Sequence, residues 1–282
     1  MNEIYGAVVG DIAGSTYEAI EATSKKSGYK IPTKNRAKVL KKSTPLFPAG
    51  SEITDDTILT CAIAEAIVNK TDYAESLRQF GKRAIDNYIK HNLFDRFGKQ
   101  FTKWCTENEQ IASYGNGCAM RVSACALAFD NLEKVLIEAQ KTCEITHNLP
   151  ECIAMTRATA GAIFLAKEKK SKQEIQNFIE TEIGHKMNYN FKYLRENYIF
   201  TSKAINSVPQ ALFCFLKSKS FEHCLRLSLS IGGDSDTICA IACSVASAYY
   251  GIPETILNNA KKFIPEEYND ILKKFNLKYG VK

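Results

Sequence analysis

Residues 229–251 read LSIGGDSDTICAIACSVASAYYG, and this stretch decides how the fold of the chain is interpreted. Its second part, residues 237–251, is built almost entirely from Ala, Cys, Ser and apolar residues at helical spacing. A helix with so few bulky side chains can approach its neighbours closely, so we expect it to lie deep inside a helical bundle. The turn in front of it carries two carboxylates, Asp234 and Asp236, which therefore stand at the edge of the core and need an explanation.

A second turn repeats this arrangement nearer the N-terminus. Residues 51–57 read SEITDDT, so Asp55 and Asp56 directly precede the apolar segment 57–68. Burying a carboxylate without a partner is expensive, so such aspartates either face water or lie against a positive group. Helix capping and the helix dipole explain one carboxylate in each turn. The second carboxylate adds repulsion, which capping does not explain.

Together the two turns contain four aspartates with hydroxyl groups beside them and no His or Cys nearby. Ligand sets made only of oxygen select Mg²⁺, Mn²⁺ or Ca²⁺ over zinc. Two divalent cations would balance four carboxylates, so the pattern favours a binuclear centre with bridging carboxylates, provided that the two turns meet in the fold.

The rest of the chain also reads as helix, because apolar residues recur at helical spacing and strand-like alternation is nearly absent. No linker rich in Pro, Gly or Ser divides the chain, so we expect one all-α domain over residues 1–282, with a basic loop insertion at about 22–52. Pro150, Pro209 and Pro253 are each expected in the first turn of a helix. Helices are expected at 57–68, 74–91, 119–130, 132–146, 151–170, 172–184, 208–218, 221–231, 237–251 and 253–263.

Charge and hydropathy exclude some classes of protein. No apolar run reaches the roughly 18 residues that a membrane helix needs. The N-terminus has an acidic residue where a signal peptide would be basic, so we expect a cytoplasmic protein without a membrane partner. The formal net charge is +6, and residues 24–51 contain eight Lys and Arg residues without one acid. That stretch is either a solvated loop or an arm for an acidic partner or phosphates. No nucleic-acid motif accompanies it, which disfavours nucleic-acid binding.

The ten cysteines include no CxxC pair, and most lie among Ala, Ile and Leu. We therefore expect reduced, buried thiols that pack as small hydrophobic groups. Cys143 and His147 are the nearest approach to a zinc pattern, and the spacing does not favour zinc.

Several motifs then occur in one order along the chain. Their order and spacing resemble the ADP-ribosylglycohydrolase family of the dinitrogenase-reductase-activating glycohydrolase type, in its bacterial and phage-like branch. The resemblance covers nearly the whole chain and rests on GAVVGDIAGSTYE (6–18), TDDT (54–57), YGNGCAMRVSACAL (114–127), THNLPE (146–151), SVPQAL (207–212), GGDSDT (232–237) and AYYGIP (248–253).

This resemblance implies a multi-helix orthogonal bundle with two Mg²⁺ or Mn²⁺ ions in a cleft. It also implies hydrolysis of the bond between C1″ of ADP-ribose and an acceptor, most directly a protein side chain. The positions that match the family's metal ligands are Thr54, Asp55, Asp56, Asp234, Asp236 and Thr237. Catalytic roles fall to Glu18, Asp55, Asp234 and Asp236, and substrate contacts to Gly115, Asn116, Gly117, Cys118, Met120 and His147.

For the reaction, we expect water to attack C1″ with Glu18 or an aspartate as base, and the diphosphate to lie on backbone amides of residues 114–118. Asp11 is expected to accept hydrogen bonds from buried backbone beside the site, with Gly10 and Gly14 allowing close approach. Cys118 stands where the family usually has Ser or Ala.

Other functions stay open at the level of sequence. The same site would serve a free ADP-ribose derivative or ADP-ribosylated nucleic acid. A binding protein is a second class: an antitoxin or immunity factor that docks on a cognate ADP-ribosyltransferase through the basic residues 24–42. Replacing Asp234 and Asp236 by alanine separates the classes, because turnover is then lost while protection by binding persists.

Overall fold

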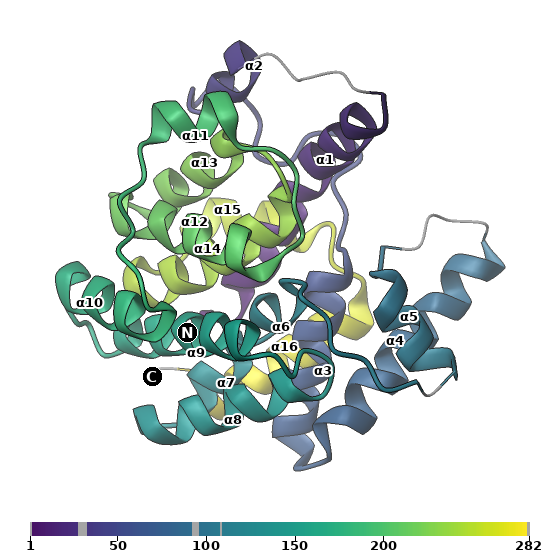
Figure 1. Ribbon diagram of the computed structural model, residues 1–282. Helices are drawn as coiled ribbons and strands as arrows, with labels where there is room; N and C mark the ends of the chain where they lie inside the picture. The colour runs from purple at the N-terminus through teal and green to yellow at the C-terminus, as the bar shows by residue number, and fades with distance from the viewer. Residues whose placement is uncertain (1, 28–32, 92–95, 108, 281–282) are drawn as a thin grey trace.

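The computed structural model describes residues 2–27, 33–91, 96–107 and 109–280, and over these residues the chain is all-α, as expected. No helix among them is long and apolar enough to cross a membrane. One isolated β-bridge joins Gly115 to Lys203. The helices, labelled in Figure 1, are α1 (Tyr5–Ser27), α2 (Thr33–Lys38), α3 (Asp55–Asn69), α4 (Tyr73–Lys90), α5 (Lys99–Glu107), α6 (Gly117–Met120), α7 (Ser123–Ala128), α8 (Leu132–Glu144), α9 (Pro150–Lys167), α10 (Lys172–Ile183), α11 (Phe191–Asn197), α12 (Ala204–Lys217), α13 (Phe221–Ile231), α14 (Ser235–Tyr250), α15 (Glu254–Lys261) and α16 (Glu266–Tyr279).

The small-residue helix α14 lies inside the bundle, as the sequence predicts. Every residue from Ser235 to Ala248 is buried, and α1, α9, α12 and α13 pack around it (Figure 1). Its longest contact is with α1, where glycines of α1 meet the α14 backbone. A Cβ added at Gly10 would lie 2.2 Å from the Cys239 carbonyl oxygen, and one at Gly14 would lie 2.4 Å from the Cα of Asp236. The two helices therefore touch backbone to backbone, and this contact fixes the side chains of α1 against those of α14.

Two helix predictions are wrong in detail. The helix expected at 119–130 is split into α6 and α7, because the chain turns at Arg121 and Val122 to bring the Arg121 guanidinium inside. Pro209 lies in the interior of α12 instead of its first turn, because that helix already begins at Ala204. Pro150 begins α9 and Pro253 caps α15, in agreement with the expectation for those two residues.

The basic stretch 22–52 is not one loop. Helix α1 continues to Ser27 and α2 follows, while residues 28–32 and the side chains of 19–35 lie outside the described part of the chain. The portion from residue 36 onward is held against the bundle. Arg36 donates to the carbonyl groups of Tyr198 and Ile231 at 2.9 and 3.1 Å. Arg226 of α13 donates to those of Val39 and Lys41, at 2.7 and 2.9 Å. This portion is therefore anchored by buried hydrogen bonds and is not a free solvated arm.

All ten cysteines are free thiols and all are buried, as the sequence predicts. They occur on α3, α5, α6, α7, α8, α9, α12, α13 and α14, where they pack among apolar side chains.

Candidate active site

A cavity of about 370 Å³ opens between α1, α3, the loop before α6 and the start of α14. The sequence-predicted residues that line it are Glu18, Asp55, Gly115, Asn116, Gly117, Met120, His147, Asp234, Asp236 and Thr237. Three others do not line it. Thr54 and Asp56 are buried directly behind the carboxylate end, and Cys118 is buried under the loop with its thiol directed at the Gly115 carbonyl group. The fold thus gathers the predicted residues around one cleft.

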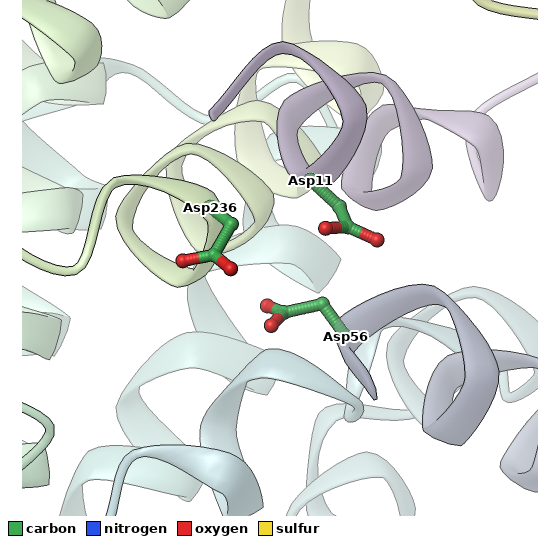
Figure 2. A group of neighbouring side chains, drawn as sticks. All are labelled: Asp11, Asp56 and Asp236. Carbon is green, nitrogen blue, oxygen red and sulfur yellow. The ribbon is translucent and has the colours of Figure 1, made fainter. Parts of the chain in front are cut away.

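The two aspartate turns meet, which the sequence alone left undecided. Thr237 donates a hydrogen bond of 3.1 Å to Oδ2 of Asp56 across 181 residues of chain. Figure 2 shows Asp11, Asp56 and Asp236, from α1, α3 and α14, with their carboxylates directed toward one another. In this group one oxygen of each carboxylate lies within 4.8 Å of the others. Glu18, Asp234 and Asp236 form a second such group. Asp236 belongs to both, so the two groups adjoin.

Asp11 ties the start of α3 to α1. It accepts hydrogen bonds from the backbone amides of Thr54 and Thr57, at 2.9 and 3.1 Å, and from the hydroxyl groups of the same residues. Burial nevertheless raises the pKa of its carboxyl. The expected role toward buried backbone is confirmed. The geometry adds that Asp11 also faces Asp56 and Asp236, a position that the motif comparison did not assign to a ligand.

The carboxylate end of the cleft carries charge that the described protein groups do not balance. Oδ1 of Asp56 is buried and has no hydrogen-bond partner. Burial, followed by the repulsion of neighbouring carboxylates, raises the pKa of Asp55, Asp56 and Asp236 well above the usual range. A cation between these groups would remove both effects. Because every donor here is an oxygen, the residues fit a hard divalent cation.

Asn116 holds the second aspartate turn in place. Its side-chain amide donates to Oδ2 of Asp234 at 2.7 Å and to the Ser207 hydroxyl at 3.1 Å. These bonds lower the tendency of the buried Asp234 carboxyl to take up a proton, although burial still raises its pKa. The amide expected to contact substrate is therefore engaged in positioning a carboxylate.

The amides proposed for the diphosphate are partly occupied. The backbone amide of Gly115 donates to the Ser113 hydroxyl at 3.0 Å, and that of Asn116 donates to the Ser202 carbonyl at 2.8 Å. Two of the backbone amides that were expected to receive the diphosphate are therefore engaged within the protein, and the expectation itself stays a prediction. The β-bridge between Gly115 and Lys203 explains why the Asn116 amide is engaged, because the loop pairs with the segment before α12.

A buried cation also lines the cleft. Arg121 is fully buried and lines the cavity, and its Nη2 donates to the Thr142 carbonyl and the Thr146 hydroxyl at 2.9 and 2.7 Å. Its Nε and Nη1 have no hydrogen-bond partner, and no described carboxylate lies within ion-pair distance. Burial lowers its pKa. Sequence reasoning quoted Arg121 within a motif but gave it no role. The signal was a lone arginine inside the apolar run AMRVSACALAF.

A third charged group closes the mouth of the cleft. Arg96 donates to Oε2 of Glu18 at 3.3 Å and also pairs with Glu52, so it joins α1 to the segment before α3. Burial, followed by the charge of Asp234, raises the pKa of Glu18 to about 7. No motif pointed to Arg96, because it is 78 residues from Glu18 in sequence.

Comparison with known proteins identifies the family of this chain. The family model of ADP-ribosylglycohydrolases matches residues 3–279. ADP-ribosylhydrolase ARH3 of Mus musculus is 26% identical over 95% of this chain and 88% of its own length. The ADP-ribosyl-[dinitrogen reductase] glycohydrolase of Rhodospirillum rubrum is 27% identical over 88% of this chain and 84% of its own length. A solved ADP-ribosylglycohydrolase-related protein complex has the same fold, with a TM-score of 0.68 at 20% identity over 99% of this chain and 96% of its own. The chain therefore belongs to the ADP-ribosylglycohydrolase family and is an enzyme of that family of hydrolases.

Proposed function

We propose that this enzyme hydrolyses the glycosidic bond between C1″ of ADP-ribose and a side chain of a modified protein, in a reaction that needs divalent cations. The observation that carries the proposal is the charge pattern of the cleft. Clustered carboxylates line the cleft together with the buried guanidinium of Arg121, which pairs with none of the described carboxylates. ADP-ribose has the matching pattern: a ribosyl carbon that becomes positive as its bond breaks, and a diphosphate.

Two adjoining cation positions fit the carboxylate end. Asp11, Asp56 and Asp236 would hold one ion, and Glu18, Asp234 and Asp236 the other. Asp55 lines the same end, while Thr54 and Thr237 orient Asp11 and Asp56 through their hydroxyl groups. We propose Mg²⁺ or Mn²⁺ because all donors are oxygens. When bound, such ions neutralise the carboxylates and act as Lewis acids toward hydroxyl oxygens.

The residues of the chain then divide the remaining work. Glu18 takes a proton from the water that attacks C1″ while the bond from C1″ to the acceptor breaks, and the acceptor leaves with the bonding electron pair and takes up a proton. The place of Glu18 on the cleft wall supports this role. The ionised aspartates stabilise the positive charge that develops on the ribosyl ring. Arg121 supplies a positive field for the diphosphate from behind the loop that contains Gly115 and Gly117. The Rhodospirillum rubrum relative is named for a protein acceptor, dinitrogen reductase, which supports a protein acceptor here.

The test is release of ADP-ribose from peptides modified on Arg, Ser or Thr, with O-acetyl-ADP-ribose and an ADP-ribosylated oligonucleotide in parallel. We expect release from at least one peptide linkage, its loss in EDTA, and its return on addition of Mg²⁺ or Mn²⁺. Release only from the small molecule or the oligonucleotide would overturn the protein acceptor. No release from any substrate with metal present would overturn the hydrolytic function.

A second expected result concerns the stability of the metal-free protein. The raised pKa values of Asp55, Asp56, Asp236 and Glu18 mean that the folded state binds more protons than the unfolded state above the usual carboxyl pKa. Stability therefore falls as pH rises. Burial lowers the pKa of His147 to about 4, whereas its pKa in the unfolded chain is about 6.5. This histidine therefore makes stability rise with pH, but only below about pH 6.5. Between about pH 6.5 and 8 the Glu18 carboxyl, whose pKa is about 7, loses its proton in the folded state, and stability falls with that loss.

We thus expect the Tm in EDTA to fall across this range, and the gain in Tm from Mg²⁺ to be larger at the upper end. Thermal unfolding followed by intrinsic fluorescence measures both. A Tm in EDTA that rises with pH in this window would contradict the assignment.

A further inference from the structure

The hydroxyl group of Thr146 lies between Arg121 and His147. Nη2 of Arg121 donates to Thr146 Oγ1 at 2.7 Å, and the same oxygen lies 2.7 Å from Nδ1 of His147. Arg121 and Thr146 are fully buried and His147 is 5% exposed. Three polar side chains thus form a chain of hydrogen bonds that runs from the interior to the wall of the cleft.

The chemistry of the three side chains determines which atom donates and which accepts in each of these hydrogen bonds. A guanidinium only donates, so the Thr146 oxygen accepts from Arg121. The hydroxyl group still has its own proton, and a buried donor needs an acceptor. Nδ1 of His147 is the other hydrogen-bonding neighbour that the structure gives this hydroxyl. The Thr146 proton therefore points to Nδ1, and Nδ1 carries no proton.

The other ring nitrogen then carries the proton. Burial, with the positive charge of Arg121, lowers the pKa of His147 to about 4, so the imidazole is neutral at pH 7 and has one proton. With Nδ1 accepting, that proton is on Nε2. Nε2 faces the loop of the cleft: a Cβ added at Gly115 would lie 3.3 Å from it, and one at Gly117 would lie 3.7 Å from it.

We propose that Arg121 and Thr146 are positioning residues that hold His147 as the neutral Nε2–H tautomer, a fixed hydrogen-bond donor for the diphosphate of a nucleoside diphosphate ligand. The inference rests on the proposed function. The resemblance to the family already implies a substrate contact for His147, and the structure adds the two residues that fix its ring. Arg121 contributes twice, since its charge also favours an anion in the cleft.

Substitution of Thr146 removes the middle residue of the hydrogen-bonded series from Arg121 to His147 and so tests the proposal. Thr146→Val keeps the shape and removes the hydroxyl, whereas Thr146→Ser keeps the hydroxyl. Binding of ADP, measured by calorimetry in EDTA, is expected to weaken about tenfold in T146V and to stay within about twofold in T146S, because a hydrogen bond to a charged group is worth about 1.5 kcal/mol or more. Equal affinity of T146V and the unsubstituted enzyme would overturn the proposal.

Two further readouts do not depend on the folding of T146V. Long-range ¹H–¹⁵N spectra of the unsubstituted enzyme are expected to show His147 protonated at Nε2 and bare at Nδ1 at pH 7; the opposite tautomer or a doubly protonated ring would overturn the assignment. Replacement of His147 by glutamine places an amide donor near the Nε2 position, and replacement by asparagine places it near Nδ1. We expect H147Q to bind ADP more tightly than H147N, and the reverse order would count against the proposal.

These measurements need neither hydrolysis nor metal. The tautomer and the ADP affinities therefore test the positioning role, whereas release of ADP-ribose tests the proposed function separately.

Discussion

Replacing Asp236 by asparagine is expected to lower kcat/KM for ADP-ribose release by about a thousandfold or more, comparable to the loss of a principal electrostatic group in other enzymes. Asp236 is the one residue that belongs to both carboxylate groups of the cleft. Asparagine keeps the volume of the side chain but removes the charge and the second acceptor oxygen that a bridging ligand needs. Both proposed cation positions are therefore damaged by one substitution. Initial rates at several concentrations of Mg²⁺ and Mn²⁺ measure the effect.

The same substitution is expected to leave the metal-free protein at least as stable as before, because it removes one of several mutually repelling buried charges. The rise in Tm on adding Mg²⁺ should shrink at the same time. Asp270→Asn is the matched control, since that carboxylate is half exposed on α16 and pairs with the exposed Lys273. A D236N enzyme with more than a tenth of the original kcat/KM would contradict the shared role of Asp236, whereas a collapse of its metal-free Tm would show that the carboxylate serves the fold.

Gly10→Ala is expected to destabilise the protein by about 3 kcal/mol or more, at the upper end of overpacking effects. The added methyl group would lie 2.2 Å from the carbonyl oxygen of Cys239 and 2.6 Å from the backbone nitrogen of Ala240. Both contacts are with helix backbone, which cannot rotate away as a side chain does. Helices α1 and α14 must therefore separate, and Asp11 moves away from Asp236.

Urea unfolding followed by far-UV circular dichroism measures this loss. Gly98→Ala is the control, because a Cβ at Gly98 meets no atom of the described residues within 4 Å. We expect G98A to unfold at the same urea concentration as the original chain. If G10A did so too, the backbone contact between α1 and α14 would not be tight in solution.

The helical fold was predictable because many helices carry a regular apolar pattern, as α4, α8, α10 and α13 do. Helix α1 was not predicted as a helix. Its buried half, from Tyr5 to Ser15, is apolar or small on every side, so it lacks the contrast between two faces on which periodicity depends. Its glycines, which argue against helix in isolation, are explained only by the α14 backbone beside them.

The candidate site was predictable where it rests on local motifs. The paired aspartates of the two turns, Glu18 and His147 all face one cleft or lie directly behind it. The parts of the site that the sequence did not predict depend on contacts between residues far apart in sequence. Arg96 reaches Glu18 from the segment before α5, and Asp11 reaches Asp56 from another helix. The engaged amide of Asn116 depends on Ser202, 86 residues away in the printed sequence, which no local pattern reveals.

The opposite charges that line the cleft have a consequence for competition among metabolites. Under the proposed function Arg121 and the neutral His147 bind a diphosphate, which ADP-ribose and ADP share. Discrimination between them falls to the carboxylate end, which contacts the ribosyl group only in its metal-loaded form under the proposed reaction. An enzyme short of divalent ions would thus be occupied by the common nucleotides of the cell, and the supply of these ions would set not only its rate but also its choice of ligand.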